Sequence, residues 1–329
     1  MLELASFLYG IILNIRYKLY NMNILKKRKV DGVYVVCIGN ITAGGTGKTP
    51  AVQYFANKFI AEGKKTAVVS RGYMGKRKFE PFLVSDGEKI QCTPKESGDE
   101  PYLHAISLKC PIVVAKDRYK AVEYCKEKFN SEIVIMDDGF QHMQLERDWN
   151  IVLIDATNPF GGKKLLPAGR LREPLLGLER ANEFIITKSD MVTQEKLENI
   201  VKELKSEKKK ISKAVHFPEK FLQYGKIIEK EKLLNKKALL FSGIANPKNF
   251  RKSLDTLGIE TAGEISYRDH YNFSIKDVKE IEKKFEESNA EIILTTEKDF
   301  VKIEKICSKE FSDKLYVLKI EFKILEENI

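Results

Sequence analysis

Six short apolar runs, each bounded by turn residues, follow one another between residues 33 and 188. They are Val33–Gly39, Lys65–Ser70, Pro111–Ala115, Glu132–Asp137, Asn150–Asp155 and Glu183–Lys188. Because these runs are short, rich in Val and Ile, and do not alternate with polar residues, they are typical of strands buried on both faces. Helix-length segments at 49–62 and 117–129 separate some of them. The pattern predicts an α/β fold with a mostly parallel sheet.

A second series of elements follows a lysine- and glutamate-rich segment at 191–236, which contains few strand signals and begins as a helix. The expected strands are Lys237–Gly243, Glu264–Tyr267, Glu291–Thr295 and Lys314–Ile324, and the expected helices are Asn246–Leu257 and Ser274–Ser288. This order predicts a second, smaller α/β domain. We therefore divide the chain into an N-terminal helix with a basic cluster (1–29), a larger domain (30–212) and a smaller domain (213–329).

The segment 2–25 is rich in Leu, Ile, Phe and Tyr, but Asn14, Arg16 and Lys18 interrupt it. It contains no run of about 18 uncharged apolar residues, so no transmembrane helix is predicted. A signal peptide fits poorly, because the basic cluster at 26–29 follows the apolar stretch. Two interpretations remain: an amphipathic helix in the headgroup region with its basic cluster on anionic lipid, or a packed helix with a solvated basic end.

Composition and charge narrow the class of partner. The 329 residues are 43% apolar and 32% charged, which excludes wholesale disorder. The net charge of +10 predicts an anionic partner. Half of this excess lies in residues 1–29, which contain six basic residues and one acidic residue. Five scattered cysteines without a CxxC pair predict free thiols, and four histidines without zinc spacing make a zinc site unlikely.

The strongest motif is the segment GNITAGGTGKTP, from Gly39 to Pro50, which follows the first predicted strand and opens a predicted helix. A phosphate-binding loop requires this context. Its backbone N–H groups point at phosphate oxygens, and the helix N-terminus attracts the same anion. We expect nucleotide on Thr42, Ala43, Gly44, Gly45, Thr46, Gly47, Lys48 and Thr49, with Lys48 on the phosphates and Thr49 on Mg²⁺. The alternative is a turn without nucleotide, since Thr42 replaces the glycine of the general pattern.

Two aspartates, Asp137 and Asp138, end the apolar run that starts at Ile133. An apolar strand that ends in aspartate fits the Walker-B role, in which a carboxylate holds Mg²⁺ directly or through water. A plain turn or helix cap is the alternative. Because a phosphate-binding loop lies about 90 residues earlier, the pair favours a metal site.

Other polar segments lie near predicted strand ends and helix starts, where open α/β sheets place their sites. They are Arg71–Tyr73, Ser97–Pro101, Asp117–Tyr119 and Leu165–Pro174. Each segment alone is more typical of a cap or a surface pair than of a catalytic group. Their repeated position is what favours a site.

These motifs together resemble one family. The segments GNITAGGTGKTP, SRGY, SGDEPYL, KDRY, DDGFQH, LLPAGRLREP and YRDHYNFS occur in family order between residues 39 and 274. This combination resembles tetraacyldisaccharide 4′-kinase, the lipid A 4′-kinase of Gram-negative bacteria, in which Thr42 is a tolerated residue. The resemblance implies ATP-dependent phosphorylation of the 4′-hydroxyl of a tetraacyldisaccharide 1-phosphate, giving lipid IVA.

The resemblance also implies an architecture and a location. It implies a P-loop kinase domain, a second α/β domain joined by a short hinge, and an N-terminal helix that helps engage the membrane. The expected cofactors are ATP and Mg²⁺, and the expected partners are the lipid substrate and a membrane surface, without nucleic acid. The expected location is the cytoplasmic face of the bacterial inner membrane, as a peripheral or monotopic protein.

Residue roles follow by matching positions to the family's motifs. Asp99, in SGDEPYL, matches the catalytic base, and His270, in YRDHYNFS, matches its partner. Lys48 is the third expected catalytic residue. We expect Asp99 to orient the sugar hydroxyl and accept its proton late in a loose transition state, with His270 tuning Asp99. His270 lies in the predicted second domain, so domain closure would bring the pair together. The alternative for His270 is an ordinary surface loop residue.

The remaining roles concern the phosphates and the metal. Arg172 matches a position beside the phosphates, and Glu173 matches a position near the metal, together with Thr49, Asp137 and Asp138. Four further positions match family residues close to the site without an assigned role: Tyr73, Arg118, Gln141 and His142.

Three other functions compete with this interpretation. Thr187–Asp190 (TKSD) resembles a guanine-reading motif, but the Walker-B region reads DDG where a GTPase has DxxG. A partitioning ATPase with a deviant Walker loop places lysine where Ala43 stands here. A nucleic-acid-binding protein is suggested by charge alone, because the chain has one Trp and no recognisable nucleic-acid motif.

Overall fold

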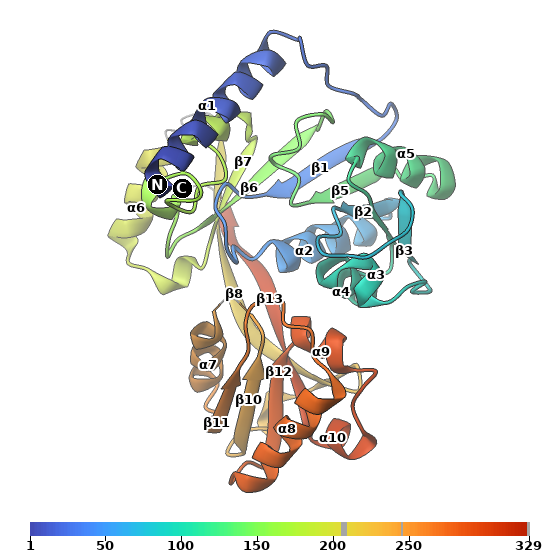
Figure 1. The fold of residues 1–329 in the computed structure, drawn as a ribbon, viewed down its shortest axis with the longest axis vertical. Helices are drawn as coiled ribbons and strands as arrows, with labels where there is room; N and C mark the ends of the chain where they lie inside the picture. Colours follow the sequence, from blue (N-terminus) through green and yellow to red (C-terminus); the bar gives the residue numbers. More distant parts are fainter. Residues whose placement is uncertain (205–208, 245, 328–329) are drawn as a thin grey trace. The chain divides into compact units, whose positions relative to one another are not determined.

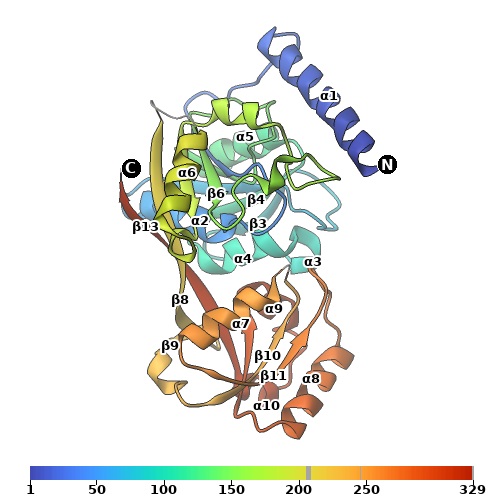
Figure 2. The same cartoon turned by 90° about the vertical axis from the view of Figure 1, so that its left-hand side faces the viewer.

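The computed structural model describes residues 1–204, 209–244 and 246–327. The chain forms two compact units by its contacts (Figure 1, Figure 2). Unit 1 comprises Met1–His216 and Phe322–Ile329, and unit 2 comprises Phe217–Glu321. The mixed α/β class with a mostly parallel sheet, predicted from the apolar runs, is confirmed.

The sheet of unit 1 has the strand order β7-β6-β1-β5-β2-β4-β3. The strands are β1 (Tyr34–Gly39), β2 (Thr66–Ser70), β3 (Phe82–Asp86), β4 (Pro111–Val114), β5 (Ile133–Asp137), β6 (Trp149–Asp155) and β7 (Glu183–Thr187). All six predicted strands are confirmed, and their neighbours pair in parallel. Only β3 was not predicted, and it pairs antiparallel with β4 at the end of this order.

Helices cover both faces of this sheet, which explains why its strands do not alternate. The helices of unit 1 are α1 (Leu2–Asn21), α2 (Lys48–Ala61), α3 (Pro94–Ser97), α4 (Asp99–Ser107), α5 (Arg118–Phe129) and α6 (Gln194–Leu204), of which α2, α4, α5 and α6 pack on the sheet. Val36 and Ile38 of β1 pack in one cluster with residues of α2 and α4. Val35 and Cys37 of the same strand pack in another with residues of α5 and α6. Because successive side chains point to opposite faces, both sets are buried.

Unit 2 contains the parallel order β11-β10-β12-β13. Its strands are β9 (Lys226–Ile228), β10 (Lys237–Ser242), β11 (Glu260–Ser266), β12 (Ile292–Thr296) and β13 (Leu315–Glu327), and its helices are α7 (Pro247–Thr256), α8 (Ile275–Glu287), α9 (Glu297–Ile303) and α10 (Lys309–Lys314). Each strand and helix predicted for the second series is therefore present.

The segment between the two series differs from its prediction. It contains the expected helix, α6, but also β8 (Lys210–Gln223), a long strand that pairs in parallel with β7. The two units divide inside β8 and inside β13, whereas the sequence places one boundary between 212 and 213. Phe322 of β13 contacts the rings of Tyr54 and His216 at centroid distances of 5.5 and 5.4 Å, so the end of β13 packs in unit 1. The domain limits and the hinge stay predictions.

Helix α1 contacts the rest of unit 1 through four buried residues. Ser6, Gly10, Leu13 and Tyr20 are its buried residues. A Cβ on Gly10 would lie 3.0 Å from Cδ1 of Leu165, which shows how closely the helix approaches the segment 165–174. Most of its other large apolar residues are exposed instead: Leu2, Leu4, Phe7, Leu8, Ile11, Ile12 and Ile15. Among the described helices, none combines the length and apolarity that crossing a membrane demands.

Candidate active site

The phosphate-binding loop connects the C-terminal end of β1 to the N-terminus of α2. Two glycines permit its path: a Cβ on Gly39 would lie 2.7 Å from Cβ of Phe140, and one on Gly47 would lie 2.0 Å from Nε2 of His216. Gly47 is also in the left-handed region, with a φ of 83°, where a side chain would add strain. The first turn of α2 then carries Lys48 and Thr49, the two residues that the motif assigns to phosphate and metal.

Three charged side chains meet beside this loop, and we call them the Lys48 cluster: Lys48, Asp138 and Arg172. Nζ of Lys48 lies 3.8 Å from Oδ1 of Asp138 and donates to Oδ1 of Asn40 at 3.3 Å. Nη1 of Arg172 donates to both carboxylate oxygens of Asp138 at 2.8 Å. Although burial opposes ionisation, Lys48 and Arg172 hold the pKa of Asp138 below its ordinary value. The cluster thus joins a fixed anion to two cations that remain partly exposed.

Asp137, the other aspartate of the predicted metal site, ends β5 and is almost fully buried. One of its oxygens, Oδ2, lies 3.2 Å from Nε2 of His104, a buried residue of α4. Its Oδ1 is buried without a hydrogen-bond partner, and so is Oγ1 of Thr46 in the phosphate-binding loop. Such unsatisfied oxygens are costly unless a ligand completes them. Among the described residues, no set of three His, Cys, Asp or Glu side chains forms a metal cluster by itself.

The segment 165–174 lies against the phosphate-binding loop through its backbone. The N–H of Arg172 donates to the carbonyl of Ile41, and the N–H of Ala43 donates to the carbonyl of Arg170, both at 2.7 Å. Thr42 forms an antiparallel bridge with Leu171 between these bonds. The N–H of Ala43 is therefore occupied, and the predicted contact of Ala43 with nucleotide stays a prediction that this bond does not favour. These same backbone bonds place the side chain of Arg172 in the Lys48 cluster.

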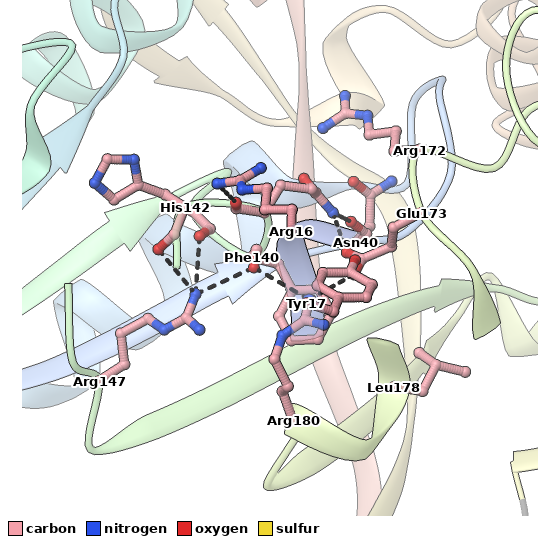
Figure 3. A network of polar contacts seen from close by, with 12 residues as sticks. Arg16, Tyr17, Asn40, Phe140, His142, Arg147, Arg172, Glu173, Leu178 and Arg180 are labelled. Carbon is pink, nitrogen blue, oxygen red and sulfur yellow. Dashed lines mark hydrogen bonds and ion pairs between the residues drawn. The ribbon is translucent and has the colours of Figure 1, made fainter. Parts of the chain in front are cut away.

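Glu173 belongs to a different region, which we call the Glu173 cluster: Tyr17, Gln141, Glu173 and Arg180. The carboxylate of Glu173 is fully buried. Tyr17 and Arg180 bind its Oε2, and Nε2 of Gln141 donates to its Oε1 at 2.6 Å. Both oxygens therefore already have protein donors, and Arg172 points away from this cluster (Figure 3). The role of Glu173 as a metal ligand stays a prediction that these contacts do not favour.

The four positions without an assigned role also differ in their surroundings. Tyr73 is exposed, while Arg118 is buried and donates to the carbonyls of Ala115 and Lys116. Burial and the nearby guanidinium groups of Arg118 and Arg147 lower the pKa of His142 to about 4, so its ring is neutral at physiological pH. Gln141 is the only one of the four in the Glu173 cluster.

The expected catalytic base and its expected histidine partner lie in different units. Asp99 is the first residue of α4 in unit 1, on the helix that also carries His104 to Asp137. His270 lies in unit 2, where its φ is 57° and its N–H donates to the carbonyl of Gly243 at 3.2 Å. The pairing of Asp99 with His270 stays a prediction.

The TKSD segment contacts the phosphate-binding loop. Oγ1 of Thr187 donates to the carbonyl of Thr46 at 3.2 Å, and Nζ of Lys188 donates to that of Gly45 at 3.1 Å. Lys188 also pairs with Asp155 at the end of β6. These residues support the loop's main chain, a role that the resemblance to a guanine-reading motif did not reveal.

Sequence reasoning also missed several residues that surround the site. They are Tyr17, Asn40, His104, Arg180 and His216. Asn40 is within the quoted loop motif, and His104 follows the SGDEPYL segment by one position, so both had a positional signal. Tyr17, Arg180 and His216 carried none, because their contacts join segments far apart in the chain.

The site's motifs match known proteins over the whole chain. Residues 1–329 match the family model of tetraacyldisaccharide-1-P 4′-kinase. Relatives named tetraacyldisaccharide 4′-kinase include one from Halothermothrix orenii, 38% identical over 98% of this chain and 88% of the relative, and one from Elusimicrobium minutum, 40% identical over 88% and 78%.

A solved structure agrees with these sequence relatives. The "apo" form of LpxK from Aquifex aeolicus in complex with ATP is 32% identical, with a TM-score of 0.79, covering 97% of this chain and 93% of that one. These matches confirm the resemblance that the motifs indicated. The chain belongs to the tetraacyldisaccharide-1-P 4′-kinase family of phosphotransferases.

Proposed function

We propose that the Lys48 cluster performs the reaction of this family, the ATP-dependent phosphorylation of the 4′-hydroxyl of tetraacyldisaccharide 1-phosphate, which supplies lipid A biosynthesis. The observation that carries this assignment is the meeting of Lys48, Asp138 and Arg172 beside the phosphate-binding loop. Phosphoryl transfer depends on positioning and charge neutralisation, because its transition state is loose. Lys48 and Arg172 supply positive charge, and Asp138 fixes both before any ligand arrives.

The residues around the loop also fit Mg²⁺. Oδ1 of Asp137 and Oγ1 of Thr46 are buried oxygens without a partner, and oxygen ligands are those that Mg²⁺ prefers. Thr49, Asp137 and Asp138 would hold the ion, directly or through water. When bound, Mg²⁺ would neutralise charge on the phosphates. His104 fixes Oδ2 of Asp137, which leaves Oδ1 as the free ligand.

Asp99 and His270 complete the proposal. Asp99 would orient the sugar hydroxyl and accept its proton, and His270 would hold Asp99 in that orientation. Asp99 stands at the start of the same helix that positions Asp137 through His104. A rigid helix would therefore set the distance between base and metal, which is what positioning of the acceptor requires. A hinge between the units would bring His270 to Asp99.

Helix α1 would hold the protein at the lipid surface. Its exposed apolar residues are Leu2, Leu4, Phe7, Leu8, Ile11, Ile12 and Ile15. These side chains, followed by the basic cluster at 26–29, are typical of a helix in the headgroup region on anionic lipid. The location at the cytoplasmic face of the bacterial inner membrane is part of this proposal, because the reaction needs both ATP and a membrane lipid.

Transfer of label from [γ-³²P]ATP to tetraacyldisaccharide 1-phosphate in detergent micelles tests the proposed function. The wild-type chain should label the lipid in the presence of Mg²⁺. Lys48→Ala should lower kcat about 100- to 1,000-fold, the cost of losing one preorganised electrostatic group. Lys58→Ala changes an exposed lysine of the same helix and serves as the matched control. Absence of labelled lipid with the wild type, or equal rates for Lys48→Ala and Lys58→Ala, would defeat the assignment.

A further inference from the structure

Helix α1 contacts the site through three polar side chains that point inward, opposite its exposed apolar residues. The hydroxyl of Tyr9 donates to the carbonyl of Arg172 at 2.7 Å, and Nη2 of Arg16 donates to the carbonyl of Gln141 at 3.1 Å. The hydroxyl of Tyr17 donates to Oε2 of Glu173. A helix used only as a lipid anchor needs none of these bonds. Their targets are residues of two motif segments, DDGFQH and LLPAGRLREP.

Arg180 and Tyr17 both bind the carboxylate of Glu173. The Arg180 guanidinium lies 4.9 Å from the ring centroid of Tyr17 and 4.5 Å from that of Phe140, so it is stacked between two aromatic rings (Figure 3). It also pairs with Oε2 of Glu173. Burial and the charge of Glu173 raise the pKa of Tyr17, so the phenol remains a proton donor. A Cβ on Gly177 would lie 2.2 Å from Oε2, which shows how tightly the chain encloses this carboxylate.

The second oxygen of Glu173 leads to the phosphate-binding loop. Nε2 of Gln141 donates to Oε1 of Glu173 at 2.6 Å and to the carbonyl of Asn40 at 2.8 Å. Asn40 is fully buried, and its side-chain Oδ1 accepts from Nζ of Lys48 at 3.3 Å. Its Nδ2 donates to the carbonyl of Thr42 at 2.7 Å, which ties the side chain to the loop. A continuous path of hydrogen bonds therefore runs from Tyr17 to Lys48.

We propose that Tyr17 and Arg180 are positioning residues for phosphoryl transfer, and that they set Lys48 through Glu173, Gln141 and Asn40. This inference rests on the proposed function of Lys48 as the ligand of the ATP phosphates. Without Tyr17 or Arg180, the carboxylate of Glu173 loses a donor at Oε2. Gln141, which binds Oε1, then no longer holds the carbonyl of Asn40 in place. Helix α1 is thereby part of the catalytic assembly in addition to its proposed contact with lipid.

The test measures ATP affinity without lipid, by isothermal titration calorimetry in Mg²⁺ buffer, for the wild type and Tyr17→Phe. This variant removes one hydroxyl and keeps the ring on Arg180, so the fold is preserved. We expect ATP to bind about five- to tenfold more weakly, about the effect of one typical hydrogen bond, because the lost bond acts on Lys48 only through the intervening residues. Glu3→Gln is the matched control, because it breaks an exposed ion pair of the same helix with Lys164 and leaves the path intact. Its ATP affinity should equal that of the wild type.

A double-mutant cycle tests whether the path transmits the effect. In a Gln141→Leu background, where the path is already interrupted, Tyr17→Phe should cause no further loss of ATP affinity. At saturating ATP, the KM for the lipid should be unchanged in Tyr17→Phe. Additive losses in the cycle, unchanged ATP affinity in Tyr17→Phe, or an effect confined to the lipid KM would each overturn the proposal.

The same titrations separate this proposal from the one on which it rests. If Lys48→Ala binds ATP as tightly as the wild type, the proposed role of Lys48 fails, and the positioning proposal fails with it. If Lys48→Ala loses affinity but Tyr17→Phe does not, only the positioning proposal is wrong.

Discussion

Arg172 and Glu173 are neighbours in the chain, yet their side chains enter regions of opposite construction. The Lys48 cluster, which Arg172 joins, keeps about a quarter of the side-chain surface of Arg172 and Asp138 exposed, at 27% and 28%. The Glu173 cluster encloses a carboxylate that is 0% exposed and fills both of its oxygens with protein donors. Charge density alone therefore does not distinguish a ligand site. The feature that favours ligand binding is a pair of buried oxygens without a hydrogen-bond partner, Oδ1 of Asp137 and Oγ1 of Thr46, beside the phosphate-binding loop.

The largest effect on folding should come from Glu173→Gln. This change removes the negative charge that pairs with the largely buried Arg180, and breaking a buried pair costs about 3–5 kcal/mol. Urea unfolding should therefore show a lower free energy of unfolding by roughly that amount. Glu179→Gln, an exposed change next to Arg180 in the chain, should alter it by less than about 0.5 kcal/mol. Equal stabilities of the two variants would remove the distinction between the clusters.

Asp138→Asn should show the opposite profile. The amide keeps the size of the side chain but loses the charge that fixes Lys48 and Arg172, so we expect kcat about 100-fold lower. The free energy of unfolding should stay within about 1 kcal/mol of the wild type, because the cluster is partly open to solvent. Asp31→Asn, at an exposed position, is the control for both readouts. A variant that unfolds easily but retains its rate once folded would place Asp138 with the structural residues.

A smaller effect should appear in the pH dependence of stability. Burial lowers the pKa of His142 and of His216 from 6.5 to about 4. Between these values the unfolded chain binds more protons than the folded chain, so stability is complete above pH 6.5 and falls as the pH drops toward 4. The pKa of Asp138 is lowered as well, but its contribution is lost only below the ordinary carboxyl value of 3.8. Burial raises the pKa of Glu297 to about 7, so this carboxyl group opposes the histidines between pH 7 and 4.5. With two histidines against one carboxyl group, a net decrease in stability remains.

Replacing His142 checks this window. The decrease in the free energy of unfolding between pH 7.5 and pH 5 should be smaller in His142→Gln than in the wild type by roughly 2 kcal/mol. The measurement is a urea titration at each pH. An identical decrease in both proteins would show that His142 titrates normally in the folded state.

The sequence predicted well those parts of the fold that depend on local patterns. All six apolar runs are strands, because burial on both faces demands continuous Val and Ile, and the loop motif lies between β1 and α2 as its glycines require. The strand β8 was missed, because lysines and a proline interrupt its apolar residues at 210–223. Its presence moves the limit between the units into the middle of a strand.

The site was predictable only where a motif carried it. Lys48, Asp138 and Arg172 came from three motifs and are brought together by the structure. Glu173 came from the same motif as Arg172, but its partner Tyr17 lies 156 positions away and left no signal in spacing. Arg172 and Glu173 stand at a bend of the chain, and one side chain joins the Lys48 cluster while the other is buried in the Glu173 cluster. The motif indicates that both residues are important. It does not indicate which of them lies beside the phosphate-binding loop and which is buried.

The most direct test of the account is the rate of phosphoryl transfer by Arg172→Met at saturating ATP and lipid. It should be measured at a temperature at which circular dichroism shows the variant and the wild type fully folded. We expect a rate about 100-fold below the wild type, because the proposed role of the guanidinium is to act on the phosphates while it holds Asp138. A rate near that of the wild type would contradict the account and place Arg172 with Glu173 among the residues that only support the fold.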